Sequence, residues 1–149
     1  MRNVRDAACV LVDHGQITAT RRGEIIYPTQ PGGPIRLQQR MESRPADGLC
    51  RSLLNIGPVC SEDLRQVGIH TLADLRSTGA TTSFQSVMVD KLHRGDKHNL
   101  FHAMYYYALW GAIHDIHCTS LSPGLRTSLQ KIVSNIKTDL LGPPLQTNV

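Results

Sequence analysis

The sequence predicts an all-α fold: a small multi-helix domain over residues 49–149, preceded by a short extension over residues 1–48. Apolar residues recur at helical spacing from residue 49 onward, and Gly and Pro punctuate the chain where helices would start and stop, giving about five or six helices. Composition also changes near residue 48, because residues 1–48 hold seven Arg and no Lys. The 149 residues suit one domain with an appendage.

The extension has one strand-like stretch, Cys9–Val12. Residues 13–15 favour a turn and Gln16–Thr20 would form the returning strand, so the pattern predicts a β-hairpin. An isolated hairpin is only marginally stable in water. The extension is therefore expected either to pack on the helical part or to be poorly ordered.

The first helices of the helical part follow a short apolar stretch around Leu49. Pro58 suits the first turn of a helix that runs to about residue 67, because its missing N–H costs nothing there. Gly68 stands where a left-handed cap is needed. Thr71 and Asp74 have the spacing of a capping box for the next helix.

Three further helices are predicted. One begins at Thr81 or Thr82 and ends by Gly95. The longest covers residues 97–117, and its apolar stripe is too wide for a surface helix, so we expect it at the centre of the domain. The last begins after Ser122 and ends before the glycine and prolines at residues 142–144.

Residues 53–75 resemble a helix-hairpin-helix, whose hairpin would be Asn55, Ile56, Gly57 and Pro58. Ile56 should insert into the core. Gly57 is expected to have a positive φ or to lie where two helices approach closely. On this basis Gly57→Val would cost about 1–3 kcal/mol of stability. These four residues are the candidate binding residues.

DNA-binding hairpins of this type hold a phosphate with backbone N–H groups and a helix N-terminus. Here Asn55 stands where a second glycine is preferred, and Glu62 and Asp63 are expected near the helix start, where they would repel a phosphate. The sequence favours a packing or protein-docking hairpin. Direct DNA binding through the hairpin is the alternative.

Four segments of the helical part form a recognisable series: residues 54–58 (LNIGP), 67–75 (VGIHTLADL), 107–113 (YALWGAI) and 121–123 (LSP). With these segments in this order, the helical part resembles the C-terminal domain of the TfoX/Sxy family of bacterial competence regulators. The resemblance covers about residues 50–135. Two positions depart from the family pattern: Asp115 stands where the family often has Gly, and Cys118 where it often has Trp.

The resemblance implies a helical domain with a helix-hairpin-helix element and a non-enzymatic role in transcriptional regulation of competence. Full-length members carry a separate α+β domain before this one, and residues 1–48 do not look like it. We therefore expect a regulatory module that works through a protein partner, with DNA as the alternative partner and no cofactor.

The spacing of the His and Cys residues gives little support for a metal site or a catalytic site. His102 and His114 lie twelve residues apart on one predicted helix, about 18 Å, so they cannot share a zinc ion. His114 and Cys118 could bind zinc only if another element supplied two ligands. Cys60 sits near a helix N-terminus, but the nearby acidic residues oppose a thiolate and no motif supplies a base.

Composition bounds the remaining function classes. The net charge of +4 permits a nucleic-acid partner without requiring one, and the longest basic run is the Arg21–Arg22 pair. The spacing of the cysteines is not that of a disulfide framework, so they are expected as free thiols.

No apolar run is long enough for a membrane span or a signal peptide, so the expected location is the cytoplasm. The aromatic run at residues 105–107, with Trp110, is read as core rather than as a base-stacking platform.

Overall fold

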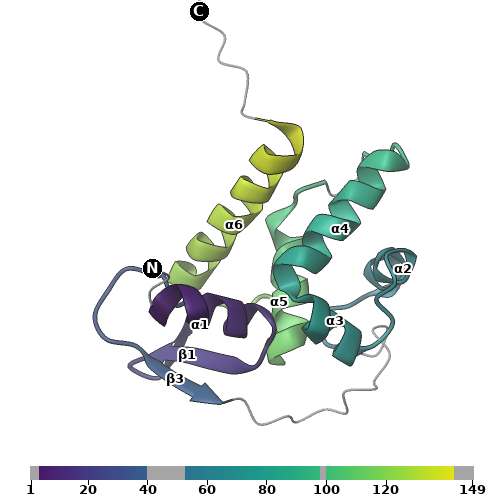
Figure 1. Ribbon diagram of the computed structural model, residues 1–149. Coiled ribbons are helices and arrows are strands. Elements are labelled where there is room, and N and C mark those ends of the chain that lie inside the picture. Colours follow the sequence, from purple (N-terminus) through teal and green to yellow (C-terminus); the bar gives the residue numbers. More distant parts are fainter. Residues whose placement is uncertain (1–3, 40–52, 98–99, 143–149) are drawn as a thin grey trace, which may run out of the picture.

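The computed structural model describes residues 4–39, 53–97 and 100–142. Within these ranges six helices accompany a three-stranded sheet (Figure 1). In chain order they are α1 (Val4–Asp13), β1 (Ile17–Arg21), β2 (Glu24–Ile26), β3 (Arg36–Gln39), α2 (Pro58–Gln66), α3 (Leu72–Thr78), α4 (Ala80–His93), α5 (Ala103–His114) and α6 (Pro123–Leu141). None of these helices is long and apolar enough to cross a membrane.

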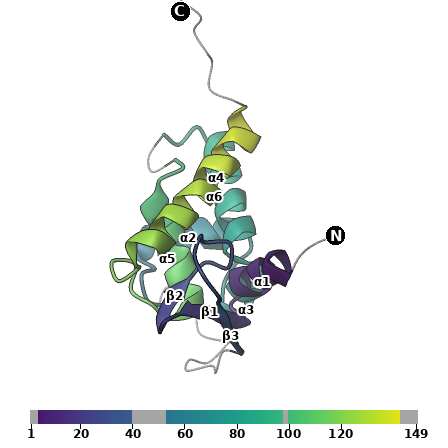
Figure 2. The same ribbon diagram turned by 90° about the vertical axis from the view of Figure 1, so that its left-hand side faces the viewer.

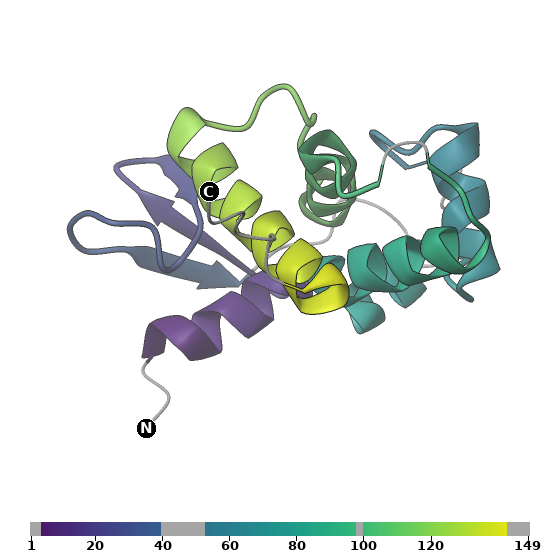
Figure 3. The ribbon, with the colours of Figure 1, turned by 90° about the horizontal axis from the view of Figure 1, so that it is seen from above.

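The elements are arranged around α5. It packs against α3, α4 and α6. In Figure 1, α4 and α6 rise on either side of it. Figure 2 turns α6 toward the viewer, and Figure 3 shows from above that α2 lies at the opposite end of the molecule from the sheet. The buried Trp110 and Tyr106 of α5 confirm the prediction that this helix is central and its aromatic residues form core.

The start of the chain corrects the predicted hairpin. Cys9–Val12 belongs to α1, not to a strand. Ala8 and Val12, four residues apart, are the buried residues of this helix, so the apolar run follows a helical period that the strand interpretation overlooked. The all-α prediction was accordingly incomplete, because an antiparallel sheet follows α1.

A β-hairpin does form, one element later than predicted. β1 pairs with β2 through a turn at Arg22 and Gly23, and β3 pairs with the other side of β1, giving the strand order β2-β1-β3. Only Ala19 and Ile26 of the sheet are fully buried. The sheet therefore contributes one small apolar face to the core.

The described part of the extension packs on the helical part. Val12, Ala19 and Ile26 share one hydrophobic core with α2–α6. The Asp13 carboxylate accepts hydrogen bonds from the Thr81 backbone N–H (3.0 Å) and hydroxyl (2.7 Å) at the start of α4. Burial raises the Asp13 pKa. Residues 40–48 of the extension, and Leu49, lie outside the described residues.

Helix boundaries follow the predicted punctuation at most ends. Thr71 and Asp74 form both hydrogen bonds of the capping box. Gly68 has φ 83, as its predicted cap role requires. The Ser122 Oγ accepts from the Leu125 N–H (3.3 Å) at the start of α6.

The central helix is shorter than predicted. α5 spans 12 residues instead of the expected residues 97–117, and α6, with 19 residues, is the longest helix described. Phe101 and Asp115 both have φ 56, a left-handed conformation that interrupts a right-handed helix on each side of α5. Neither residue is a glycine, so no glycine of this chain marks these breaks, although the family often has Gly where Asp115 stands.

Candidate functional site

The hairpin precedes α2 and turns at Asn55. This residue has φ 70, and Asn tolerates the left-handed conformation better than most side chains do. The turn lets the Ile56 N–H donate to the Leu53 carbonyl oxygen (3.2 Å). Ile56 is 5% exposed and lies in the core, as the sequence predicted.

Gly57 does not have the predicted role. Its φ is −84° and ψ is 179°, an extended conformation, and a Cβ built on it would meet no atom within 4 Å. The expectation of a positive φ or a close approach was wrong, because Asn55 takes the left-handed position two residues earlier. Gly57 is the N-cap residue of α2, and Pro58 is in the first turn of that helix.

The Asn55 side chain ties the hairpin to the loop after α5. Its Nδ2 donates to the Ile116 carbonyl oxygen (2.8 Å), and its Oδ1 accepts from the Cys118 N–H (3.0 Å). Gly111 makes room for this contact, since a Cβ there would collide with the Ile116 carbonyl oxygen and lie 2.5 Å from Asn55 Nδ2. We call these two hydrogen bonds the Asn55 latch. Asn55 adopts the left-handed conformation that a glycine would allow, and its side chain also holds the hairpin in place.

An open groove of about 420 Å³ lies beside the hairpin, between the start of α2 and the N-terminal half of α5. Val59, 68% exposed, and Met104, 42% exposed, are its most accessible apolar side chains. Met104 belongs to the apolar residues of the helix that was predicted to be central, yet it is exposed. The lining residues are Asn55, Gly57, Pro58, Val59, Cys60, His102, Met104, Tyr105 and Ala108.

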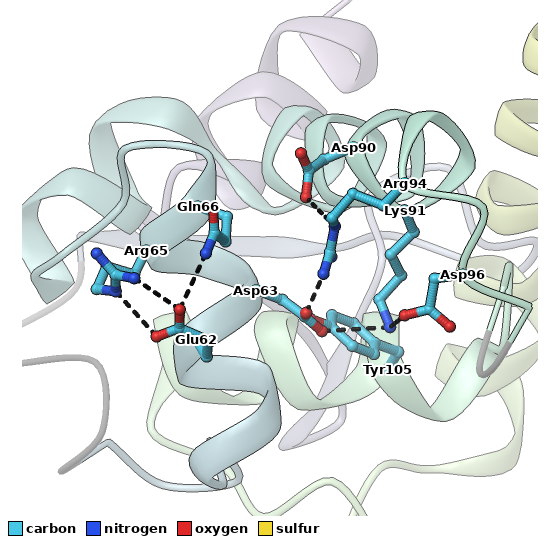
Figure 4. Close-up of polar contacts among 9 residues, drawn as sticks. All are labelled: Glu62, Asp63, Arg65, Gln66, Asp90, Lys91, Arg94, Asp96 and Tyr105. Atoms are coloured by element: carbon cyan, nitrogen blue, oxygen red, sulfur yellow. Dashed lines mark hydrogen bonds and ion pairs between the residues drawn. The ribbon is translucent and has the colours of Figure 1, made fainter.

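A charged cluster fixes α2 against α4 and α5 next to this groove (Figure 4). Asp63 of α2 is 5% exposed, and its Oδ2 lies 3.3 Å from the Lys91 Nζ and accepts from the Tyr105 hydroxyl (2.9 Å). Arg94 Nη2 lies 3.3 Å from Asp63 Oδ1. Lys91 is 2% exposed and also faces Asp96 (3.6 Å). We call this the Asp63 cluster.

The Asp63 cluster gives the groove a rigid wall. Tyr105 belongs to both, since its ring lines the groove and its hydroxyl bonds to Asp63. Burial, with Cys60 and Asp63 close by, raises the pKa of Tyr105 far above its usual range. The phenol therefore stays a neutral hydrogen-bond donor. Sequence patterns missed this cluster because its members come from three separate helices.

The two acidic residues of α2 lie further from the start of the helix than the sequence predicted. The helix begins at Pro58, so Glu62 and Asp63 lie beyond its first turn, which has no acidic residue. The exposed Glu62 carboxylate accepts from Arg65 Nη2 (2.6 Å) and Nε (2.9 Å). These hydrogen bonds lower the pKa of Glu62 to about 2. Both carboxylates are thus paired with cations, and their repulsion of an anion is weaker than expected.

The groove nevertheless offers little to a phosphate. None of its lining residues is Lys or Arg. His102 caps α5 by accepting the Met104 N–H at Nδ1 (3.2 Å), which requires that nitrogen to be unprotonated. An apolar surface without cations suits an apolar side chain of a protein partner better than a phosphate.

His114 and His117, two of the histidines considered for a zinc site, contact other groups of the protein. His114 is 7% exposed, its Nε2 lies 2.7 Å from the Val12 carbonyl oxygen, and its ring stacks on Trp110. The Nδ1 of His117 lies 2.6 Å from the Thr119 hydroxyl. Among the described residues, no group of three His, Cys, Asp or Glu side chains could hold a metal ion.

Comparison with known proteins finds a family match over most of the helical part. Residues 47–133, which include the hairpin, the Asn55 latch and the Asp63 cluster, match the TfoX C-terminal domain. The chain belongs to the TfoX C-terminal domain family. Residues 1–40 of this TfoX-family chain match a second family, described as a protein of unknown function (DUF3253). No curated protein and no solved structure matches the chain.

The match connects this TfoX-family chain with competence-related regulation. It also agrees with the residues on which the sequence resemblance rested. Gly111, within the YALWGAI segment of that resemblance, now has a structural reason: it accommodates the Asn55 latch.

Proposed function

We propose that this chain is a non-enzymatic regulatory module that acts in transcriptional regulation of competence by binding a protein partner at the hairpin groove. The observation that carries the proposal is the apolar groove itself, with Val59 and Met104 exposed on a surface that has no Lys or Arg. The family match supports the regulatory role.

The groove has the properties of a preformed docking surface. The Asn55 latch and the Asp63 cluster hold its two sides, so binding would order few additional groups. Burying the exposed parts of Val59 (68%) and Met104 (42%) would contribute about 1–2 kcal/mol for each side chain, in proportion to the area removed from water. Met is flexible and adapts to different partners. The expected partner is a protein that inserts one or more apolar side chains.

Capture from a bacterial lysate with matched variants tests this proposal. The bait proteins are the parent, Val59→Ser/Met104→Ser, and the control Val10→Ser/Leu141→Ser, whose residues are exposed apolar side chains away from the groove. We expect quantitative mass spectrometry to find proteins enriched by the parent and the control but not by the groove variant. Identical capture by all three baits would contradict docking at the groove.

Direct DNA binding through the hairpin is the second candidate. The observation in its favour is that the first turn of α2 has no acidic residue, so its unpaired backbone N–H groups could face a phosphate. Titration of duplex DNA at increasing salt tests it, because phosphate contacts make affinity fall steeply with salt. Glu62→Lys should then strengthen binding, and an absence of binding at about 50 mM salt removes this candidate.

A further inference from the structure

The β1–β2 turn has an unusual residue at its tip. Arg22 and Gly23 both have positive φ, 51° and 83°. Two-residue turns of this type strongly prefer Asn, Asp or Gly at the first position. The Cβ of an Arg makes this left-handed backbone conformation unfavourable, and the Arg side chain forms no local hydrogen bond that would offset the cost. Strain held at an exposed position points to a role for that side chain beyond the fold.

Two hollows flank this turn, and Arg22 lines both of them. One is about 540 Å³ and the other about 490 Å³. Arg36 of β3 lines the second hollow, in the register that places it opposite Thr20 of β1. Within the described residues, the side chains of Arg22 and Arg36 have neither a hydrogen bond nor an ion pair. We call this region the Arg22–Arg36 notch.

Arg21 has a structural role beside the notch, because its guanidinium is already hydrogen-bonded within the protein. Its guanidinium donates to the carbonyl oxygens of Pro31 (2.7 Å) and Gln30 (3.1 Å). Gly32 lies against this guanidinium, and a Cβ at that position would collide with it. Arg21 therefore holds the loop that precedes β3 against β1, and this loop supplies the Pro34 wall of both hollows.

We propose that the Arg22–Arg36 notch binds the phosphate backbone of duplex DNA. A guanidinium matches two phosphate oxygens at once, and Arg recognises phosphate in this bidentate way better than Lys. Glu24 is the one acidic residue among those lining the two hollows. The major groove of DNA is wide enough to admit a two-stranded β-ribbon, which brings its side chains close to the flanking phosphates.

This inference is independent of the hairpin groove. The notch is lined by residues of the sheet and its turns, and the groove by residues around the start of α2. Figure 3 shows the sheet and α2 at opposite ends of the molecule. The notch is lined by charged and polar side chains, Thr20 and Gln38 included, while the groove is apolar. A chain with both surfaces could hold DNA at one end and a protein at the other.

Fluorescence anisotropy with a labelled duplex of about 20 base pairs, at about 50 mM salt and above, tests the notch. The variants are Arg22→Asn, Arg22→Asn/Arg36→Gln and the control Arg126→Gln/Lys131→Gln, which removes two exposed charges from α6. We expect the notch double variant to lose about tenfold or more in affinity and to lower the salt slope by about two, while the control stays near the parent.

Thermal melting of the same variants separates binding from folding. Asn suits the left-handed position, so Arg22→Asn should melt at or above the parent temperature while it weakens DNA binding. A parent chain that binds no duplex at about 50 mM salt would overturn the proposal. Equal losses in the notch and control variants, a lower melting temperature for Arg22→Asn, or binding to phosphatidylserine vesicles but not to DNA would also overturn it.

Discussion

Replacing Gly111 by Ala should destabilise the protein, although Ala is the better helix former. In an open helix the change would add about 1 kcal/mol of stability. Here the new Cβ would collide with the Ile116 carbonyl oxygen and lie 2.5 Å from Asn55 Nδ2. The loop after α5 must then move away, and the Asn55 latch must break.

The loss of stability in Gly111→Ala comes from the hydrogen bonds that require the loop after α5 to lie close to Gly111. They are the two bonds of the Asn55 latch and the bond from the Ile116 N–H to the Gly111 carbonyl oxygen (2.8 Å). At about 1 kcal/mol each, their loss outweighs the gain in helix propensity by about 2 kcal/mol. For a chain of this size the melting temperature should fall by about 4–8 °C.

Thermal and urea unfolding of matched variants measure this difference. Gly33→Ala is the control, because a Cβ there meets no atom within 4 Å, and it should change stability by less than about 0.5 kcal/mol. Asn55→Gly keeps the left-handed backbone but removes the latch. In that background Gly111→Ala should cost less, since the two positions are coupled. A Gly111→Ala protein that is more stable than the parent would refute this reasoning.

Three further predictions concern charged groups. Asp63→Asn should cost about 3 kcal/mol in chemical unfolding because it leaves Lys91 buried without its closest carboxylate, and Asp63→Leu/Lys91→Met should recover part of that loss. Because burial raises the Asp13 pKa above that of the unfolded chain, protonation of this carboxyl adds stability as pH falls through the raised pKa toward the ordinary pKa of Asp, and this stability is lost again as pH rises; Asp13→Asn should flatten this part of the stability–pH curve. The Glu62 carboxyl should titrate near pH 2 by NMR, and Arg65→Gln should return its pKa toward the ordinary range.

Local signals in the sequence were sufficient for much of the helical part. Capping residues such as Thr71 and Ser122 act within one turn of their own helix, so their roles are visible in a short window of sequence. The same reasoning failed at Phe101, whose left-handed conformation is not signalled by a glycine, and it drew nothing from the Gly that the family often has where Asp115 stands. It also failed for Cys9–Val12, because a short apolar run fits a strand and a buried helix face equally well.

The sequence predicted the turn before α2 but not the contacts that hold it in place. The hairpin residues were found because Gly57 and Pro58 mark a turn, yet the left-handed residue is Asn55. Its partners lie more than 60 residues away, at Ile116 and Cys118, and no local pattern reveals such a contact. The exposure of Met104 depends likewise on how α2 and α5 pack.

The two family matches meet in one hydrophobic core. Val12 and Ile26, from the segment that matches DUF3253, pack in the same cluster as the residues of the TfoX C-terminal domain. Asp13 bonds to the first turn of α4, and the Val12 carbonyl oxygen to His114 of α5. Residues 4–39 therefore contribute to the structure of the helical domain instead of standing apart from it.

Site-specific photocrosslinking tests the central claim, that a protein partner occupies the hairpin groove, most directly. A photoreactive phenylalanine analogue would replace Val59 beside the groove, and Val10 of α1 as a control of comparable exposure. After irradiation in a bacterial lysate, we predict a discrete crosslinked protein from position 59 that is absent from position 10 and is lost when Met104→Ser is added. The same crosslinks from both positions, or crosslinks from position 59 that Met104→Ser leaves unchanged, would contradict the claim.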